Sequence, residues 1–352
     1  MKEKICFKEN NMKLLWNDTL IHSESCMFAL SDYVNLLFDA KEVIKVETPS
    51  QGVVYEPGKD YIFDEKNNTI KLTPSSRIPF LGRDVCYPEK DLRIYPEKNS
   101  NAIGGAVSGG YLLFNNDDFF ARHQVEVTYR AKCNDFDPQL SAQKNRLPRI
   151  RRKISAGQSL KVLLHGDSIS AGYNATKFTN TPPYNPCYME LVCGNIPGNH
   201  TLVNRAVSGK GIKYPRDIFD EWINDAPDLM VIAFGMNNCS STPVENFISE
   251  LDWIINANRK VSPDTEYIIV TPMTGNAEWQ PTVPGPDLEY ARAMCGYVSG
   301  SPNDIAVADV QSVWRKILAR KKFYDMTGNG VNHPNDYGHR IYASVLLDLL
   351  GF

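Results

Sequence analysis

The segment Lys161-Val162-Leu163-Leu164-His165-Gly166-Asp167-Ser168 is an apolar strand that runs directly into a polar turn. From this segment to the end of the chain, apolar strands alternate with polar loops and helical patterns. The predicted strands are Lys161–His165, Thr201–Ala206, Leu229–Phe234, Tyr267–Thr271 and Ile305–Val310, and Phe247–Ala257 has a helical pattern. Several strands are continuous apolar runs, which suit a parallel sheet covered on both faces. The sequence therefore predicts a three-layer α/β/α sandwich over residues 151–352.

Residues 1–150 follow a different pattern, in which short β-type runs are separated by Asn, Asp, Gly and Pro. Residues 60–64 and 69–73 alternate apolar with polar side chains on either side of a turn, which indicates a β-hairpin. Val125–Arg130 again has a period of two. We therefore predict a β-rich N-terminal domain of the sandwich or jelly-roll type. The basic run that follows, within residues 134–160, is interpreted as a solvated linker or the edge of the first strand.

Bulk properties restrict the possible partners. The net charge of -3 gives no bulk attraction to nucleic acid or to an anionic membrane, so neither partner is predicted. No apolar run approaches the roughly 20 residues needed to span a bilayer, and residues 1–8 do not build a signal sequence. The eight cysteines show no CxxC or metal-like clustering. We expect a cytoplasmic protein with reduced thiols, no cofactor and no metal; a secreted chain without its signal would look the same.

Small or polar residues with possible chemical roles follow three of the predicted strands. Ser168 comes directly after the first strand, where its own N–H and a helix N-terminus can stabilise negative charge. Gly209 follows the second strand, and its missing side chain lets its N–H approach a bound oxygen. Asn237 follows the third strand with a carboxamide donor. Each residue alone is explained as well by a turn or a helix cap, so the inference depends on their combination.

A histidine completes the set near the C-terminus. Of the six histidines, His333 is the one on a loop beyond the last predicted strand and ahead of an apolar helical pattern. A neutral imidazole there can take a serine proton and return it to the leaving group. His339, which we expect inside the final helix, is the rival base.

The short segments around Ser168, Gly209, Asn237 and His333 form four sequence blocks. In order and spacing these four blocks resemble those of the GDSL or SGNH hydrolases, and the resemblance covers about residues 160–352. It implies Ser168 as nucleophile and His333 as general base. It also implies an oxyanion hole made of the Ser168 and Gly209 N–H groups and the Asn237 side chain. The third block of the family usually ends in Asp, where this chain has Asn238. We interpret that change as an altered structural hydrogen bond and not as altered chemistry.

The family usually has an Asp three residues before the His, but this chain has Gly330 there. If the loop carries one extra residue, Asn329 falls where the acid is expected. Asp325, an Asn side-chain carbonyl or a backbone carbonyl could each accept a hydrogen bond from the imidazole. We favour Asp325 slightly, because an uncharged acceptor would stabilise the imidazolium less. A Ser-His dyad stays open.

The predicted function is a serine esterase that removes small acyl groups, mainly acetyl, from a carbohydrate through an acyl-enzyme. The order of domains resembles certain two-domain carbohydrate acetylesterases. Trp279, in the loop of residues 273–286, could stack on a sugar ring or serve as a core or interdomain contact. A lipid esterase, a thioesterase and a non-catalytic sugar-binding protein are the alternatives. The expected partner is a small-molecule or carbohydrate ester, and the oligomeric state is not predicted.

Overall fold

A five-stranded parallel sheet lies at the centre of the C-terminal half, with the strand order β12-β11-β13-β14-β15. Its strands are β11 (Lys161–Gly166), β12 (Thr201–Asn204), β13 (Leu229–Ala233), β14 (Glu266–Val270) and β15 (Ile305–Ala308). All five predicted strands are confirmed, although Val310 belongs to the following helix. After β11 the chain forms β12 on one side of it, and it then crosses over to form β13 on the other side of β11. In such sheets ligands bind at this switch point, beyond the carboxyl ends of the strands.

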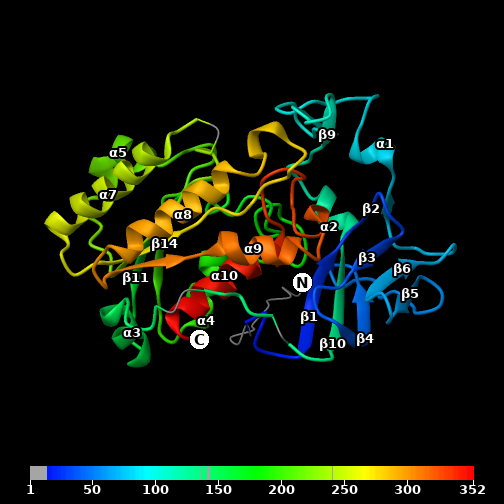
Figure 1. Ribbon diagram of the computed structural model, residues 1–352, viewed down its shortest axis with the longest axis horizontal. Helices are drawn as coiled ribbons and strands as arrows, with labels where there is room; N and C mark the ends of the chain where they lie inside the picture. Colours follow the sequence, from blue (N-terminus) through cyan, green and yellow to red (C-terminus); the bar gives the residue numbers. More distant parts are fainter. Residues whose placement is uncertain (1–13, 135, 141–142, 240) are drawn as a thin grey trace, which may run out of the picture.

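Helices cover both faces of this sheet, so the predicted α/β/α sandwich is confirmed. Val162 and Leu164 of β11 pack in the same cluster as Trp314, whereas Leu163 packs with Trp222 on the other face. The first face carries α3 (Pro148–Ser155), α4 (Tyr188–Asn195), α9 (Val310–Leu318) and α10 (Asp336–Leu350). The second face carries α6 (Phe219–Trp222), α7 (Val244–Val261) and α8 (Pro286–Ser299), with α5 (Tyr214–Asp217) beside them (Figure 1).

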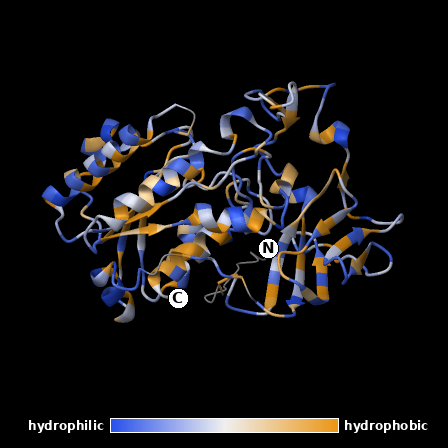
Figure 2. Ribbon diagram, in the orientation of Figure 1, coloured by the Kyte–Doolittle hydropathy of each residue, from blue (hydrophilic) through white to orange (hydrophobic). Residues whose placement is uncertain are grey.

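The N-terminal half is β-rich, as predicted. A three-stranded antiparallel sheet has the order β1-β10-β4, and a second has the order β3-β6-β5. Their strands are β1 (Leu20–Cys26), β3 (Tyr33–Asn35), β4 (Ala40–Glu47), β5 (Tyr61–Asp64), β6 (Thr69–Leu72) and β10 (Val125–Ala131). The predicted hairpin is the antiparallel pair β5 and β6. Hydrophobic and hydrophilic residues alternate along these strands in Figure 2, as expected for strands with one buried face.

Smaller elements complete this half and the connecting loops. They are the strands β2 (Phe28–Ala29), β7 (Phe80–Leu81), β8 (Ala102–Gly104) and β9 (Tyr111–Leu113), the helices α1 (Arg83–Cys86) and α2 (Phe119–His123), and the 3-10 turns η1 (Gln280–Thr282) and η2 (Phe323–Asp325). The computed structural model describes residues 14–134, 136–140, 143–239 and 241–352. Among the helices of these ranges, none combines the length and apolar character needed to cross a bilayer.

The basic run between the two halves is more ordered than a solvated linker. Arg146 donates to the carbonyl groups of Val298 and Ile305, and Arg151 donates to the last carbonyl groups of α10. The last carbonyl groups of a helix have no partner within it and carry partial negative charge, so cations there are favourable. The linker interpretation is therefore wrong for these two arginines. Helix α3 spans the proposed domain boundary at residues 150–151.

Candidate active site

Ser168 lies in the turn after β11, at the carboxyl edge of the sheet, and is 2% exposed. The turn is tight because Gly166 has no side chain: a Cβ there would lie 2.3 Å from Ser170 Oγ. Asp167 Oδ1 accepts the Ile169 N–H at 3.0 Å, which closes the turn. Burial raises the pKa of Asp167 to about 7. The Gly-Asp-Ser sequence thus fixes the backbone that presents the serine.

His333 meets this serine from the loop before α10. Its Nε2 lies 2.8 Å from Ser168 Oγ. The loop is held by Asn329, whose buried Oδ1 accepts the backbone N–H groups of Val331, Asn332 and His333 at 3.0 Å each. Asn329 therefore shapes the backbone of the loop; its Oδ1 is occupied there and does not accept from the imidazole.

The other imidazole nitrogen meets a residue that the sequence analysis did not single out. His333 Nδ1 lies 2.6 Å from Asn174 Oδ1. Asn174 Nδ2 donates to the Asn116 carbonyl at 3.1 Å, which turns the amide so that its oxygen faces the ring. Asn174 has a φ of 63°, in the left-handed region that asparagine tolerates better than most residues. The geometry is thus that of a Ser-His-Asn line of hydrogen bonds.

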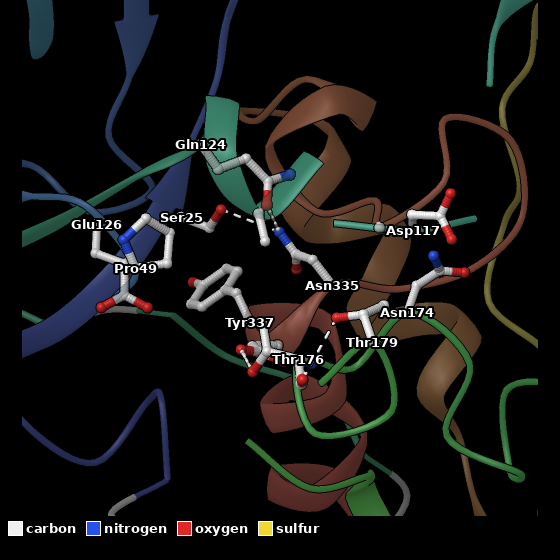
Figure 3. A pocket seen from close by; sticks show the side chains of 13 residues that line it. Ser25, Pro49, Asp117, Gln124, Glu126, Asn174, Thr176, Thr179, Asn335 and Tyr337 are labelled. Atoms are coloured by element: carbon white, nitrogen blue, oxygen red, sulfur yellow. Dashed lines mark hydrogen bonds between the residues drawn. The ribbon is translucent and has the colours of Figure 1, made fainter. Parts of the chain in front are cut away.

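Helix α10 and the loop that carries Asn174 are joined directly. Asp336, the first residue of α10, accepts the Thr176 backbone N–H at 2.8 Å and the Thr176 hydroxyl at 2.6 Å. Figure 3 shows Asn174, Thr176 and Thr179 around one small cavity, with Asp117 of the N-terminal half beside them. The bond between Thr176 and Asp336 therefore fixes Asn174 relative to His333, although the two lie far apart in the sequence.

The structure corrects the prediction that Asp325 orients His333. Asp325 is buried, and its carboxylate accepts the backbone N–H groups of Met27 at 2.8 Å and Lys322 at 2.9 Å. It also lies 3.6 Å from the buried Lys321 Nζ, which contacts Glu24 of β1 at 2.8 Å. A buried ammonium needs carboxylate partners. Asp325 thus belongs to a charged network that joins the two halves of the chain.

The position where the family has its acid is physically closed in this chain. Gly330 has a φ of 94°, and a Cβ there would lie 2.3 Å from the Leu113 carbonyl oxygen of β9. A side chain would collide with the N-terminal half, which leaves no room for the usual Asp. Asn174 instead approaches the imidazole from the loop between β11 and α4.

The candidate oxyanion donors lie in the loops after β12 and β13. Gly209 has a φ of 77° and is exposed, which leaves its backbone accessible. One N–H of Asn237 Nδ2 donates to the Lys210 carbonyl at 3.0 Å, and the same nitrogen carries a second N–H. Asn238 Oδ1 accepts the Ile212 N–H at 3.1 Å. Asn238 thus has a structural hydrogen bond that ties the two loops together, in agreement with its predicted role.

The electrostatic environment keeps His333 neutral. Burial, with a smaller contribution from nearby His339, lowers the pKa of His333 to about 3. The neutral Asn174 offers no charge that would raise it again. Because Asn174 Oδ1 accepts from Nδ1–H, the Nε2 lone pair faces the serine hydroxyl, which is the arrangement that a general base requires.

Two other predicted residues have structural contacts. His339 is buried in α10, where its ring lies parallel to Tyr188 with centroids 6.2 Å apart, and burial lowers its pKa to about 4. The hydroxyl of Ser168 faces His333 and not this rival. Trp279 donates its Nε1–H to the Gly104 carbonyl at 3.0 Å and packs against the β8–β9 hairpin. This matches an interdomain contact, and sugar stacking by Trp279 stays a prediction. Within the described ranges, no group of three or more His, Cys, Asp or Glu residues is placed to hold a metal ion.

The chain is similar to known proteins both in sequence and in structure. The sequence model of the GDSL-like lipase/acylhydrolase family matches residues 164–341. An acetylxylan esterase from Geobacillus stearothermophilus is similar in structure, with 19% identity and a TM-score of 0.44 over 55% of this chain and 94% of that one. A two-domain esterase active on acetylated mannans has 20% identity and a TM-score of 0.44, over 59% of this chain and 55% of that one.

A further similar structure is a member of the lipolytic G-D-S-L family from Veillonella parvula. It has 19% identity and a TM-score of 0.43, over 53% of this chain and 96% of that one. No curated protein matches the sequence.

Proposed function

Because the chain belongs to the GDSL-like lipase/acylhydrolase family, whose sequence model matches residues 164–341, we propose that it is a serine esterase that removes acetyl and other small acyl groups from carbohydrate esters. The observation that carries this proposal is the line of hydrogen bonds from Ser168 through His333 to Asn174. A buried hydroxyl, a neutral base and a fixed acceptor in this order are the parts that acyl transfer through a serine requires.

In the proposed acylation step, Ser168 Oγ attacks the ester carbonyl carbon while His333 Nε2 takes the hydroxyl proton. The carbonyl oxygen becomes an oxyanion, which accepts hydrogen bonds from the Ser168 and Gly209 N–H groups and from Asn237 Nδ2. His333 then gives its proton to the alcohol oxygen of the leaving group, and the bond between the carbonyl carbon and that oxygen breaks. A water molecule attacks the acyl-serine by the same route and releases the acid.

An uncharged Asn174 can support this chemistry because the charge on His333 is transient. The imidazolium forms only while the oxyanion is present, so its charge is balanced by the reacting group and not by a permanent carboxylate. What the base requires at rest is the correct tautomer, and a carbonyl oxygen fixes that as well as a carboxylate does. The Asn116 carbonyl supports this role, since it holds the Asn174 amide in the orientation that accepts from Nδ1–H.

Acyl-chain preference tests the substrate class. We expect hydrolysis of p-nitrophenyl esters to fall steeply from acetate to octanoate, and acetate to be released from acetylated oligosaccharides. Ser168→Ala is the control for background hydrolysis and should lose both activities. A rate that stays level or rises towards octanoate would instead support the lipid esterase or thioesterase alternative. No hydrolysis by the wild type would support a sugar-binding protein.

A further inference from the structure

An aromatic pair lies beside the candidate base. The Tyr173 ring packs edge-on against the His333 ring, with centroids 5.6 Å apart and an interplanar angle of 66°. The Phe178 ring lies on Tyr173, with centroids 4.2 Å apart and an angle of 31°. Phe178 is 48% exposed. A large aromatic face therefore meets solvent one ring away from the imidazole.

The loop holds this pair in place. The Tyr173 N–H donates to the Ser168 carbonyl at 3.0 Å, and the Phe178 N–H donates to the Ala175 carbonyl at 2.9 Å. Between them, Thr176 is bound to Asp336 at the start of α10. These bonds fix the backbone that carries the two rings relative to both Ser168 and the start of α10. Binding on a rigid platform loses less side-chain entropy than binding on mobile side chains.

We propose that the exposed face of Phe178, supported from behind by Tyr173, binds the pyranose ring of the substrate; this rests on the esterase function proposed above. A pyranose has a face of C–H groups, which packs against a flat aromatic ring, while its hydroxyl groups point outward and need polar partners. Phe178 is one aromatic ring from His333, and a sugar on its exposed face is separated from the imidazole by both Phe178 and Tyr173. The acetyl group that reaches Ser168 is therefore carried by a neighbouring sugar of the same oligosaccharide.

Polar groups suited to sugar hydroxyls lie next to this loop. Thr179 follows Phe178 in the sequence and lines the same small cavity as Asn174 and Asp117, as Figure 3 shows. Asp117 comes from the N-terminal half and is exposed. An aromatic face combined with a few polar side chains is the usual composition of a binding site for a small polar ligand. The N-terminal half would then contribute to sugar binding.

The test compares two acetate esters that differ in their alcohol. One is an acetylated xylo-oligosaccharide, and the other is ethyl acetate, whose alcohol has no ring. We expect Phe178→Ala to raise KM about three- to tenfold more for the oligosaccharide than for ethyl acetate. Phe178→Trp should restore the wild-type ratio, because it restores an aromatic face. Phe80→Ala, which removes another half-exposed phenylalanine from β7, should change neither KM.

Equal KM changes for both esters after Phe178→Ala would overturn the proposal. A loss confined to esters with long acyl chains would also overturn it, because it would make Phe178 part of an acyl site. Calorimetry then compares binding of the oligosaccharide to Ser168→Ala with binding to the same variant carrying Phe178→Ala. Because neither variant has the catalytic serine, this comparison tests the sugar site separately from the proposed catalysis. If the wild type hydrolyses ethyl acetate but neither binds nor hydrolyses the oligosaccharide, the sugar site is wrong and the esterase function stands.

Discussion

Replacing Asn174 by glycine measures what the uncharged acceptor contributes to catalysis. Glycine is preferable to alanine because the backbone at Asn174 has a φ of 63°, where a Cβ costs about 1–2 kcal/mol. The change removes the acceptor 2.6 Å from His333 Nδ1. His333 is only 7% exposed, so water has poor access to replace that bond. An unsatisfied buried donor costs about 1–3 kcal/mol, which predicts a fall in kcat of roughly 5- to 150-fold.

The assay is steady-state hydrolysis of p-nitrophenyl acetate, with urea unfolding to confirm that the variant is folded. Asn180→Gly is the matched control, because Asn180 also has a positive φ, of 53°, and is exposed on the same loop. We expect Asn174→Gly to lower kcat with little change in KM, and Asn180→Gly to change neither. If kcat of Asn174→Gly stays within about threefold of the control, the side chain of Asn174 does not orient the base, and a Ser-His dyad is the better account.

Four further outcomes follow from the same geometry. Because the base works unprotonated and burial lowers the pKa of His333 to about 3, kcat/KM should persist as pH falls from about 7 to about 5; an acid limb near the ordinary histidine pKa of about 6.5 would contradict this. Asn174→Asp should move the acid limb to higher pH, since a carboxylate stabilises the imidazolium; an unchanged limb would mean that residue 174 does not contact the ring. Asp325→Asn should lower the free energy of unfolding by about 1–3 kcal/mol and change kcat by less than about threefold, so a large loss of kcat in a stable variant would restore Asp325 as the orienting acid. Asn237→Ala should lower kcat by about a hundredfold or more; an effect on KM alone would make Asn237 a binding residue.

The fold of the C-terminal half could be predicted from the sequence because its signals are local. Strands such as Leu229–Ala233 are continuous apolar runs between polar loops, and that pattern requires burial on both faces whatever their neighbours are. Ser168 and His333 could be proposed as candidates for the same reason, since Ser168 directly follows a strand and His333 precedes the final helix. The contacts of the basic run could not be predicted, because the helix ends that Arg146 and Arg151 bind are distant in the sequence.

The third member of the hydrogen-bonded line could not be predicted, because tertiary contacts place it. Asn174 reaches His333 only because Thr176 binds Asp336 and because the Asn116 carbonyl turns the Asn174 amide. In the sequence, an asparagine on a loop is indistinguishable from an ordinary turn residue. What the sequence does show is that the usual acid three residues before His333 is replaced by Gly330, so another residue must accept from the imidazole.

In the sequence Asp325 is an acid on the same loop as His333, but its partners in the structure come from other parts of the chain. Lys321 is buried against Glu24 of β1, and Asp325 completes the set of charges around it. The Leu113 carbonyl of the N-terminal half also excludes a side chain at position 330. Contacts with the N-terminal half therefore exclude an acid at position 330 and keep Asp325 engaged away from His333. The Asn116 carbonyl, from the same half, orients Asn174 as the uncharged acceptor.

The most direct test of the proposed catalytic serine is covalent labelling by a fluorophosphonate, followed by peptide mapping. We predict one adduct, on the peptide that carries Ser168, and its loss in Ser168→Ala. Labelling should be much slower in His333→Ala, because the hydroxyl then has no base. An adduct on another residue, or undiminished labelling of Ser168→Ala, would contradict the assignment of Ser168 as the nucleophile.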